Sequence, residues 1–154
     1  MHHTRRSLLL MLFVAGGCAA SQSAPIPMHE LAKDKTTELT NGNEFLVIQT
    51  SADFAKALGR KLSHVSAQKP EEVLKAVDFK TETVVGVMLS NRGSSCTGVD
   101  ITSITQDGSG SVVHYHEHEP APGDVCLDTL YSPFHFVAIA KTSAPVKFEK
   151  DKMP

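Results

Sequence analysis

Three histidines at alternate positions, His114, His116 and His118, are the residues whose type and spacing most readily suggest chemistry. On a β-strand, residues two apart share one face at a spacing of about 6.5–7 Å. A pair of imidazoles on such a face can bind Zn²⁺ or Cu²⁺ weakly, and Asp128 or His135 could supply a further ligand. The alternative is a solvated strand face that is simply rich in histidine and holds no cofactor. Both interpretations stay open.

The first 17 residues have the composition of an export signal. Arg5 and Arg6 precede an apolar run over residues 7–14, which is too short to span a bilayer, and small residues at 15–17 lead to Cys18. A cysteine directly after such a segment resembles a bacterial lipoprotein box, in which the cysteine is acylated. We therefore expect Cys18 to anchor the mature chain in a membrane of the bacterial cell envelope. The two arginines also fit a twin-arginine motif, so the export route stays open.

Export of the chain would give each of the three cysteines a role. Acylation of Cys18 leaves Cys96 and Cys126 as a pair, separated by 30 positions. In an oxidising compartment such a pair favours a disulfide over its competitors, a two-cysteine metal half-site or two buried thiols. The sequence therefore predicts a Cys96–Cys126 bond.

Composition and motifs argue against several classes of function. The formal charge of −2 offers no basic surface for nucleic acid. No Gly-x-Ser-x-Gly nucleophile elbow is present, and no Lys-Ser or Lys-Thr follows the glycines at 108–110 as a phosphate loop requires. Cys96 could act as a nucleophile only if it were free. We expect no enzyme and no small-molecule substrate.

The remaining chain reads as a tether followed by one domain. Residues 18–43 are polar, without sustained periodicity, and are expected to form a flexible linker. The domain is expected over residues 44–150. Phe54, Leu58 and Leu62 recur at helical spacing and predict a helix over 52–62. Pro70 with two acids behind it predicts a second, short helix.

Strands are predicted from apolar runs and turn residues. Thr83 to Leu89 has the continuous apolar pattern of a central strand. Pro133 is expected to force a break or an edge between the two apolar runs that follow the last long loop. The strands predicted after the helices are 83–89, 99–105, 112–118, 125–130 and 134–140, with 146–148 as a candidate sixth. A short strand over 45–48 is predicted before the helices. The fold class expected is α+β, with one or two short helices packed on a curved antiparallel sheet or a small β-sandwich of five to six strands.

The order of motifs over residues 44–141 resembles the C-terminal domain of the protease complex subunit PrcB. The resemblance rests on Asp78-Phe79, on a Pro-Ala-Pro-Gly loop at 120–123 and on Ser-Pro-Phe-His at 132–135. The family turn with a Gly-Gly-Tyr core is replaced here by Ser-Cys-Thr at 95–97. A disulfide to Cys126 could fix that turn in place of the missing residues.

The resemblance implies a non-enzymatic domain that binds or stabilises an envelope protease. The residues that would then contact the partner are Arg92, Ser94, Ser95, Thr97, Phe134 and His135. Two alternatives remain: an exported metal-binding domain that uses the histidine strand, and a direct protease inhibitor whose rigid turn enters a cleft.

Overall fold

The computed structural model describes residues 23–62 and 70–152, and within α1 the side chains of 51–57 only. Its two helices are α1 (Ser51–Leu62) and α2 (Pro70–Lys75). Its strands are β1 (Ala24–Pro25), β2 (Met28–Thr36), β3 (Glu44–Ile48), β4 (Glu82–Met88), β5 (Arg92–Ser94), β6 (Gly98–Asp107), β7 (Gly110–His118), β8 (Asp128–Ala140) and β9 (Val146–Lys150). No helix of the described residues is long and apolar enough to cross a membrane.

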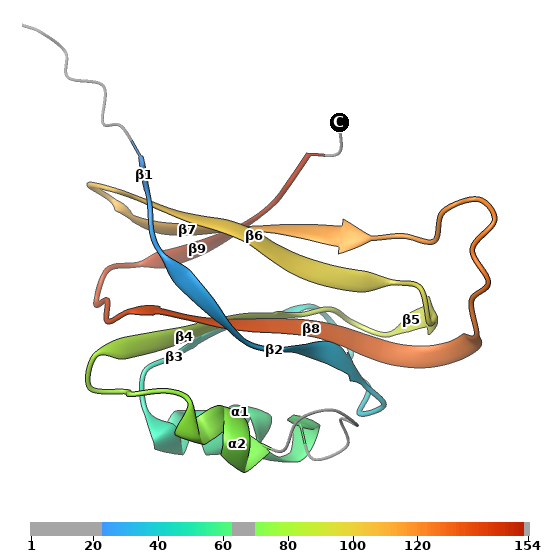
Figure 1. The fold of residues 1–154 in the computed structure, drawn as a ribbon, viewed down its shortest axis with the longest axis horizontal. Coiled ribbons are helices and arrows are strands. Elements are labelled where there is room, and N and C mark those ends of the chain that lie inside the picture. The colour runs from blue at the N-terminus through green and yellow to red at the C-terminus, as the bar shows by residue number, and fades with distance from the viewer. Residues whose placement is uncertain (1–22, 63–69, 153–154) are drawn as a thin grey trace, which may run out of the picture.

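The strands form two sheets packed face to face. One sheet has the order β1-β6-β7-β9, and the other has the order β2-β8-β4-β3 with β5 added to the end of β8. Both helices cover the outer face of the second sheet (Figure 1). The expected α+β fold with two short helices on a small β-sandwich is confirmed. The described residues contain nine strands instead of five to six, and β9 runs parallel to β7.

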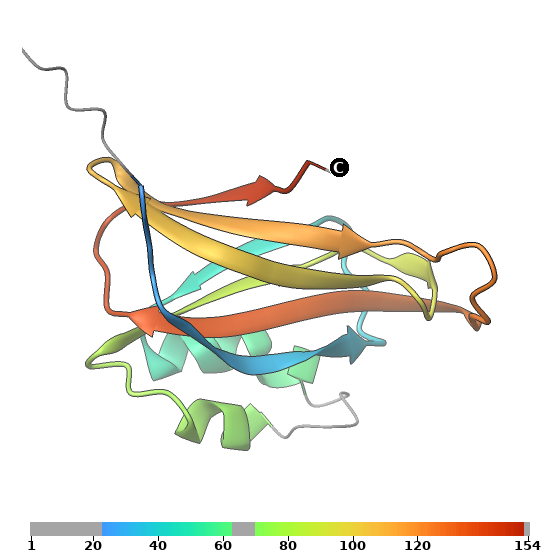
Figure 2. The same ribbon diagram turned by 45° about the horizontal axis from the view of Figure 1, so that its top comes forward.

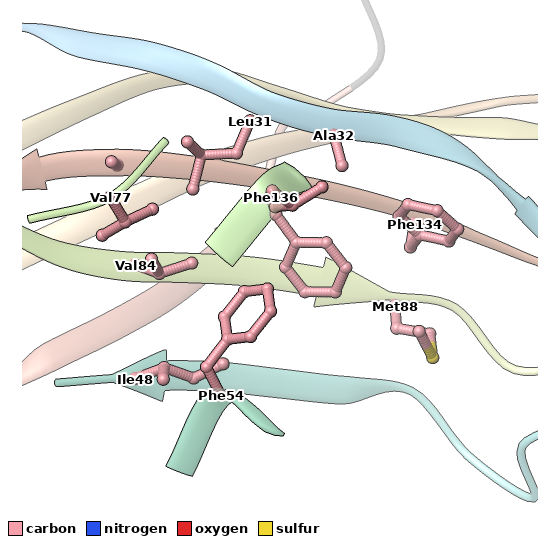
Figure 3. Close-up of a cluster of buried hydrophobic side chains, with 11 residues drawn as sticks. Leu31, Ala32, Ile48, Phe54, Val77, Val84, Met88, Phe134 and Phe136 are labelled. Atoms are coloured by element: carbon pink, nitrogen blue, oxygen red, sulfur yellow. The ribbon is translucent and has the colours of Figure 1, made fainter. Parts of the chain in front are cut away.

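The second sheet is buried on both faces because its inner strands are apolar at nearly every position. Val84 and Met88 of β4 point toward the helices with Phe134 and Phe136 of β8, where Phe54 of α1 meets them (Figure 3). The intervening residues of both strands face the first sheet and form a second cluster there. Thr50 caps α1, since its hydroxyl accepts the N–H of Asp53 at 3.1 Å.

The expected tether over 18–43 is wrong for much of its length. Residues 24–36 form β1 and β2, which cross from the first sheet to the second and close one side of the sandwich (Figure 2). Ala24 pairs with Gln106 of β6, while β2 pairs with β8 from Met28 to Thr36. Residues 24–36 therefore belong to the folded domain, which was expected to begin at 44.

The predicted break at Pro133 is also wrong, because β8 runs without interruption from Asp128 to Ala140. The ladder between β4 and β8 ends at Phe134, so the missing N–H of Pro133 falls just beyond it. The Pro133 carbonyl still accepts the N–H of Leu89 at 2.8 Å.

Candidate functional site

The predicted disulfide between Cys96 and Cys126 is confirmed. The two Sγ atoms lie 1.99 Å apart, and the Cα atoms are separated by 5.5 Å. The bond joins the turn between β5 and β6 to the loop between β7 and β8, two segments that are 30 positions apart in sequence. Both lie at the same end of the sandwich (Figures 1 and 2). We call residues 92–97 and 120–130 together the disulfide tip.

Hydrogen bonds from backbone and side-chain groups brace the disulfide tip around the bond. The N–H of Ser95 donates to the Leu127 carbonyl at 2.9 Å, and the N–H of Leu127 donates to Ser95 Oγ at 2.7 Å. The Thr97 hydroxyl donates to the Ser94 carbonyl at 2.8 Å, and the Lys35 ammonium donates to the Ser95 carbonyl. The turn is therefore held in one conformation by covalent and polar contacts together.

Three large apolar side chains project from this braced tip into solvent. Val125 is 99% exposed, Leu127 is 68% exposed and Leu130 is 54% exposed. The predicted strand over 125–130 would bury some of these three side chains. Instead the strand begins at Asp128, and the preceding residues stay in the loop. The preceding residues could have indicated this exposure, because Gly123 and Asp124 favour a loop.

The predicted contact residues have mixed positions. Ser94 and Ser95 are partly exposed on the turn. Arg92 is partly buried and engaged within the chain, because it donates to Glu117 Oε2 at 3.2 Å and to Ser90 Oγ at 2.7 Å. The remaining three residues of the prediction are at most 5% exposed: Thr97, Phe134 and His135. They offer almost no surface to a partner, so the structure does not support them as contact residues.

His135 instead links the two sheets from within. Its Nδ1 accepts the N–H of Ile101 on β6 at 2.8 Å, so the neutral ring carries its proton on Nε2. Nε2 lies 3.3 Å from Glu30 Oε2, at ion-pair distance but without the geometry of a full hydrogen bond. Asp100 Oδ1 lies 3.7 Å from Nδ1 and is itself paired with Lys33. Protonation at Nδ1 would remove the acceptor that holds Ile101.

This arrangement predicts a loss of stability in mild acid. Burial lowers the pKa of His135 below its usual 6.5, and the carboxylates of Glu30 and Asp100 offset only part of that effect. Below about pH 6.5 the unfolded chain therefore binds more protons than the folded chain. The free energy of unfolding should be constant above that pH and fall as the pH drops through it toward the folded pKa. Urea unfolding between pH 7.5 and 5.0 measures this slope.

The variant for this test is His135→Asn, whose amide oxygen can replace Nδ1 as the acceptor of the Ile101 N–H. His135→Asn should flatten the slope between pH 6.5 and 5.0, whatever its absolute stability. Equal slopes in the wild type and His135→Asn would contradict the assignment.

The histidine strand has the expected alternation but not a convergent ligand set. His114, His116 and His118 lie on β7 between buried residues, so they share the outer face. His114 Nε2 contacts Thr105 Oγ1 at 3.3 Å, whereas His118 Nε2 pairs with Asp100 Oδ2 at 2.5 Å. The His116 and His118 rings are 4.9 Å apart between centroids. His116 and His118 therefore contact each other, His114 has a separate partner, and the three rings do not converge on one point.

One group of three potential metal ligands occurs among the residues that the structure describes. It consists of Cys96, Asp124 and Cys126, whose ligand atoms lie within 4.8 Å of one another. Both sulfurs are joined in the disulfide, so neither is available as the thiolate that a metal requires. No histidine belongs to this group.

A shallow cleft of about 270 Å³ lies at the base of the disulfide tip. Lys33 and Lys35 line it on one side, and Thr97 and His118 line it on the other. Both lysines already contact chain oxygens, at Asp100 and at Ser95. Asp34 also lines the cleft, so its charges are of both signs.

Cys18, the predicted lipid attachment site, lies outside the described residues. Comparison with known protein families, with curated proteins and with solved structures found no match to this chain.

Proposed function

We propose that this chain is a non-enzymatic lipoprotein of the bacterial cell envelope whose disulfide tip binds a protein partner. The observation that carries the proposal is the exposure of Val125, Leu127 and Leu130 on a loop that a disulfide holds in place. Exposed apolar groups on a rigid support are typical of binding surfaces, because little conformational entropy is lost when a partner covers them. The resemblance to PrcB makes an envelope protease the expected partner.

The direction of the tip supports a protein partner over a lipid surface. β1 pairs with β6 at Gln106, beside the β6–β7 hairpin, whereas the tip adjoins the other end of β6 at Gly98. The 13 residues of β8 span roughly 40 Å between these ends. An acyl chain on Cys18, a few residues before β1, would hold the hairpin end near the bilayer. The disulfide tip would then point away from it.

Site-specific crosslinking tests the proposal in cells that express the full chain. A photo-crosslinking residue at position 125 should capture a protein, and the same residue at exposed Lys147 on β9 is the matched control. Val125→Asp, combined with a crosslinker at Leu127, should reduce capture about tenfold, because a central apolar anchor is lost. The captured protein, identified by mass spectrometry, should be a protease. Crosslinks to lipid alone, or equal capture at position 147, would contradict the proposal.

Direct inhibition is a second candidate, favoured by the full exposure of Val125 beside a disulfide. Under the main proposal, adding the purified chain to the captured protease should leave the peptidase rate at saturating substrate unchanged or raise it. Stoichiometric inhibition that disappears in Val125→Asp would favour the inhibitor instead.

A further inference from the structure

The stretch of residues 93–140, which supplies most of the disulfide tip, contains no lysine and no arginine. Its acidic residues are Asp100, Asp107, Glu117, Glu119, Asp124 and Asp128. Asp107 ends β6 at the hairpin that lies at the opposite end of the sandwich from the tip (Figure 1). The other carboxylates can be neutralised only by cations from outside this stretch.

Two of these carboxylates are paired with such cations. Asp100 pairs with the Lys33 ammonium of β2. Glu117 has a side chain that is 9% exposed, and its Oε2 lies 3.2 Å from Arg92 Nη2 and 3.2 Å from Lys150 Nζ. Neither carboxylate therefore adds an unpaired negative charge to the surface of the tip.

The last three carboxylates flank the apolar side chains of the tip in sequence, and we call them the acidic rim: Glu119, Asp124 and Asp128. All three residues are exposed, and no ion pair among the described residues includes any of them. Asp124 directly precedes Val125, and its Oδ2 accepts the N–H of Ala121 at 2.8 Å. Asp128 directly follows Leu127 at the start of β8. The apolar centre of the tip thus has unpaired negative charge on both sides.

The cations in contact with the tip do not cancel the acidic rim. Arg92 shares Glu117 with Lys150, so it is neutralised within the chain. The Lys35 ammonium donates to the Ser95 carbonyl, and its neighbour Asp34 lines the same cleft. Carboxylates therefore outnumber cations around the exposed apolar side chains.

We propose that the partner of the disulfide tip is a protein whose apolar pocket is bordered by lysine or arginine. This inference rests on the proposed function, because it takes the tip as the binding surface, and it adds the chemistry of the surface that the tip recognises. A desolvated apolar centre supplies most of the affinity of such an interface, and charges at its border act on the rate of association. Attraction between the acidic rim and a basic border speeds encounter and disfavours acidic competitors.

The sign of the acidic rim also favours a protein over a lipid surface as the occupant. Anionic headgroups repel carboxylates. Insertion of Val125 and Leu127 into a bilayer would carry the adjacent Asp124 and Asp128 into the headgroup region with them. A protein pocket with a basic border accepts both groups at once.

Peptide probes test this inference on the full chain reconstituted in nanodiscs of zwitterionic lipid. Each octapeptide has the same apolar centre of leucine and phenylalanine, and its flanking residues are arginine, glutamine or glutamate in matched versions. At an ionic strength of about 0.05 M the arginine version should bind about tenfold more tightly than the glutamate version, and at about 0.5 M most of that difference should vanish, since salt screens exposed charges. Empty nanodiscs measure the binding of each peptide to lipid.

Two triple variants with the same change in net charge locate the effect. The rim variant neutralises the acidic rim: Glu119→Gln, Asp124→Asn and Asp128→Asn. It should lose the preference for the arginine version, while the new amide at 124 still offers an oxygen to the N–H of Ala121. The control neutralises three exposed carboxylates on α2 and β9: Glu71→Gln, Glu72→Gln and Glu149→Gln. The control should keep the preference.

A further variant separates the acidic rim from the apolar centre. Leu127→Ala should weaken all three peptide versions by the same factor, because it changes the apolar contact alone. The inference is overturned by equal binding of the arginine and glutamate versions, by equal loss of preference in the two triple variants, or by no binding of any version at millimolar concentration. Self-association of the chain that the rim variant abolishes would also overturn it. Capture at position 125 in cells judges the proposed function separately.

Discussion

Replacement of both disulfide cysteines, Cys96→Ser with Cys126→Ser, is expected to lower the free energy of unfolding by about 3–4 kcal/mol. The bond closes a loop of 30 positions, and the loss of that constraint increases the conformational entropy of the unfolded chain. Urea unfolding of the oxidised wild type and of the double variant, both at pH 7.5, measures the difference. The midpoint should fall, and the slope with urea should rise, because the unfolded chain without the bond is less compact and exposes more surface.

Two comparisons make this measurement specific. Wild-type protein unfolded by urea in the presence of a strong reductant should have the same free energy of unfolding as the double variant, since both lack only the bond. The double variant should also lose capture by a crosslinker at position 125, because the tip is then held only by hydrogen bonds such as that of Ser95 to Leu127. A stability loss below about 1 kcal/mol would show that the unfolded chain gains little freedom when the bond is removed.

Gly86→Val is expected to destabilise the domain by about 3 kcal/mol or more. Gly86 lies in β4 opposite Phe136 of β8, and both residues are buried. A Cβ at this position would overlap with Cδ1 and Cε1 of the Phe136 ring. The ring cannot move freely, because it stacks on Phe134 at 5.3 Å between centroids. Overpacking of such a core forces side chains off their preferred rotamers or shifts the backbone.

A double-variant cycle shows whether the ring is the cause. Phe136→Leu alone should destabilise the domain, because the smaller side chain leaves space in the core. The double variant with Gly86→Val should lose less stability than the sum of the two single losses, by more than about 1 kcal/mol. Gly42→Val is the matched control, since nothing lies within 4 Å of a Cβ at that exposed turn position. Additive effects in the cycle would point to strain elsewhere in β4.

The elements that follow regular patterns could be predicted from the sequence. Helix α1 covers the residues that the apolar spacing predicts and is capped by Thr50, and β4 has the continuous burial that its apolar run indicates. The disulfide followed from the cysteine count and the expected compartment. In each case one local signal, periodicity, capping or redox environment, agrees with the tertiary structure.

The predictions that are wrong concern segments whose structure is set by tertiary contacts and not by their own sequence pattern. β2 buries only Leu31, Ala32 and Thr36, and its bulge interrupts the alternation that would have marked a strand. Its place in the sheet comes from pairing with β8, a partner about a hundred positions away. For the candidate site, the composition of residues 125–130 is that of a buried strand. Their exposure follows from the disulfide and from the start of β8 at Asp128, which composition does not reveal.

The β2–β8 ladder has a mechanical consequence for a protein anchored at one end and bound at the other. If Cys18 is acylated and the tip holds a partner, tension enters β2 at Met28 and β8 at Asp128. The two strands are antiparallel and are paired at eight positions, so such a pull slides one along the other. Ladder hydrogen bonds lie perpendicular to the strands, and sliding loads them all at once instead of one after another. The domain would therefore transmit force between membrane and partner through this eight-position strand pairing.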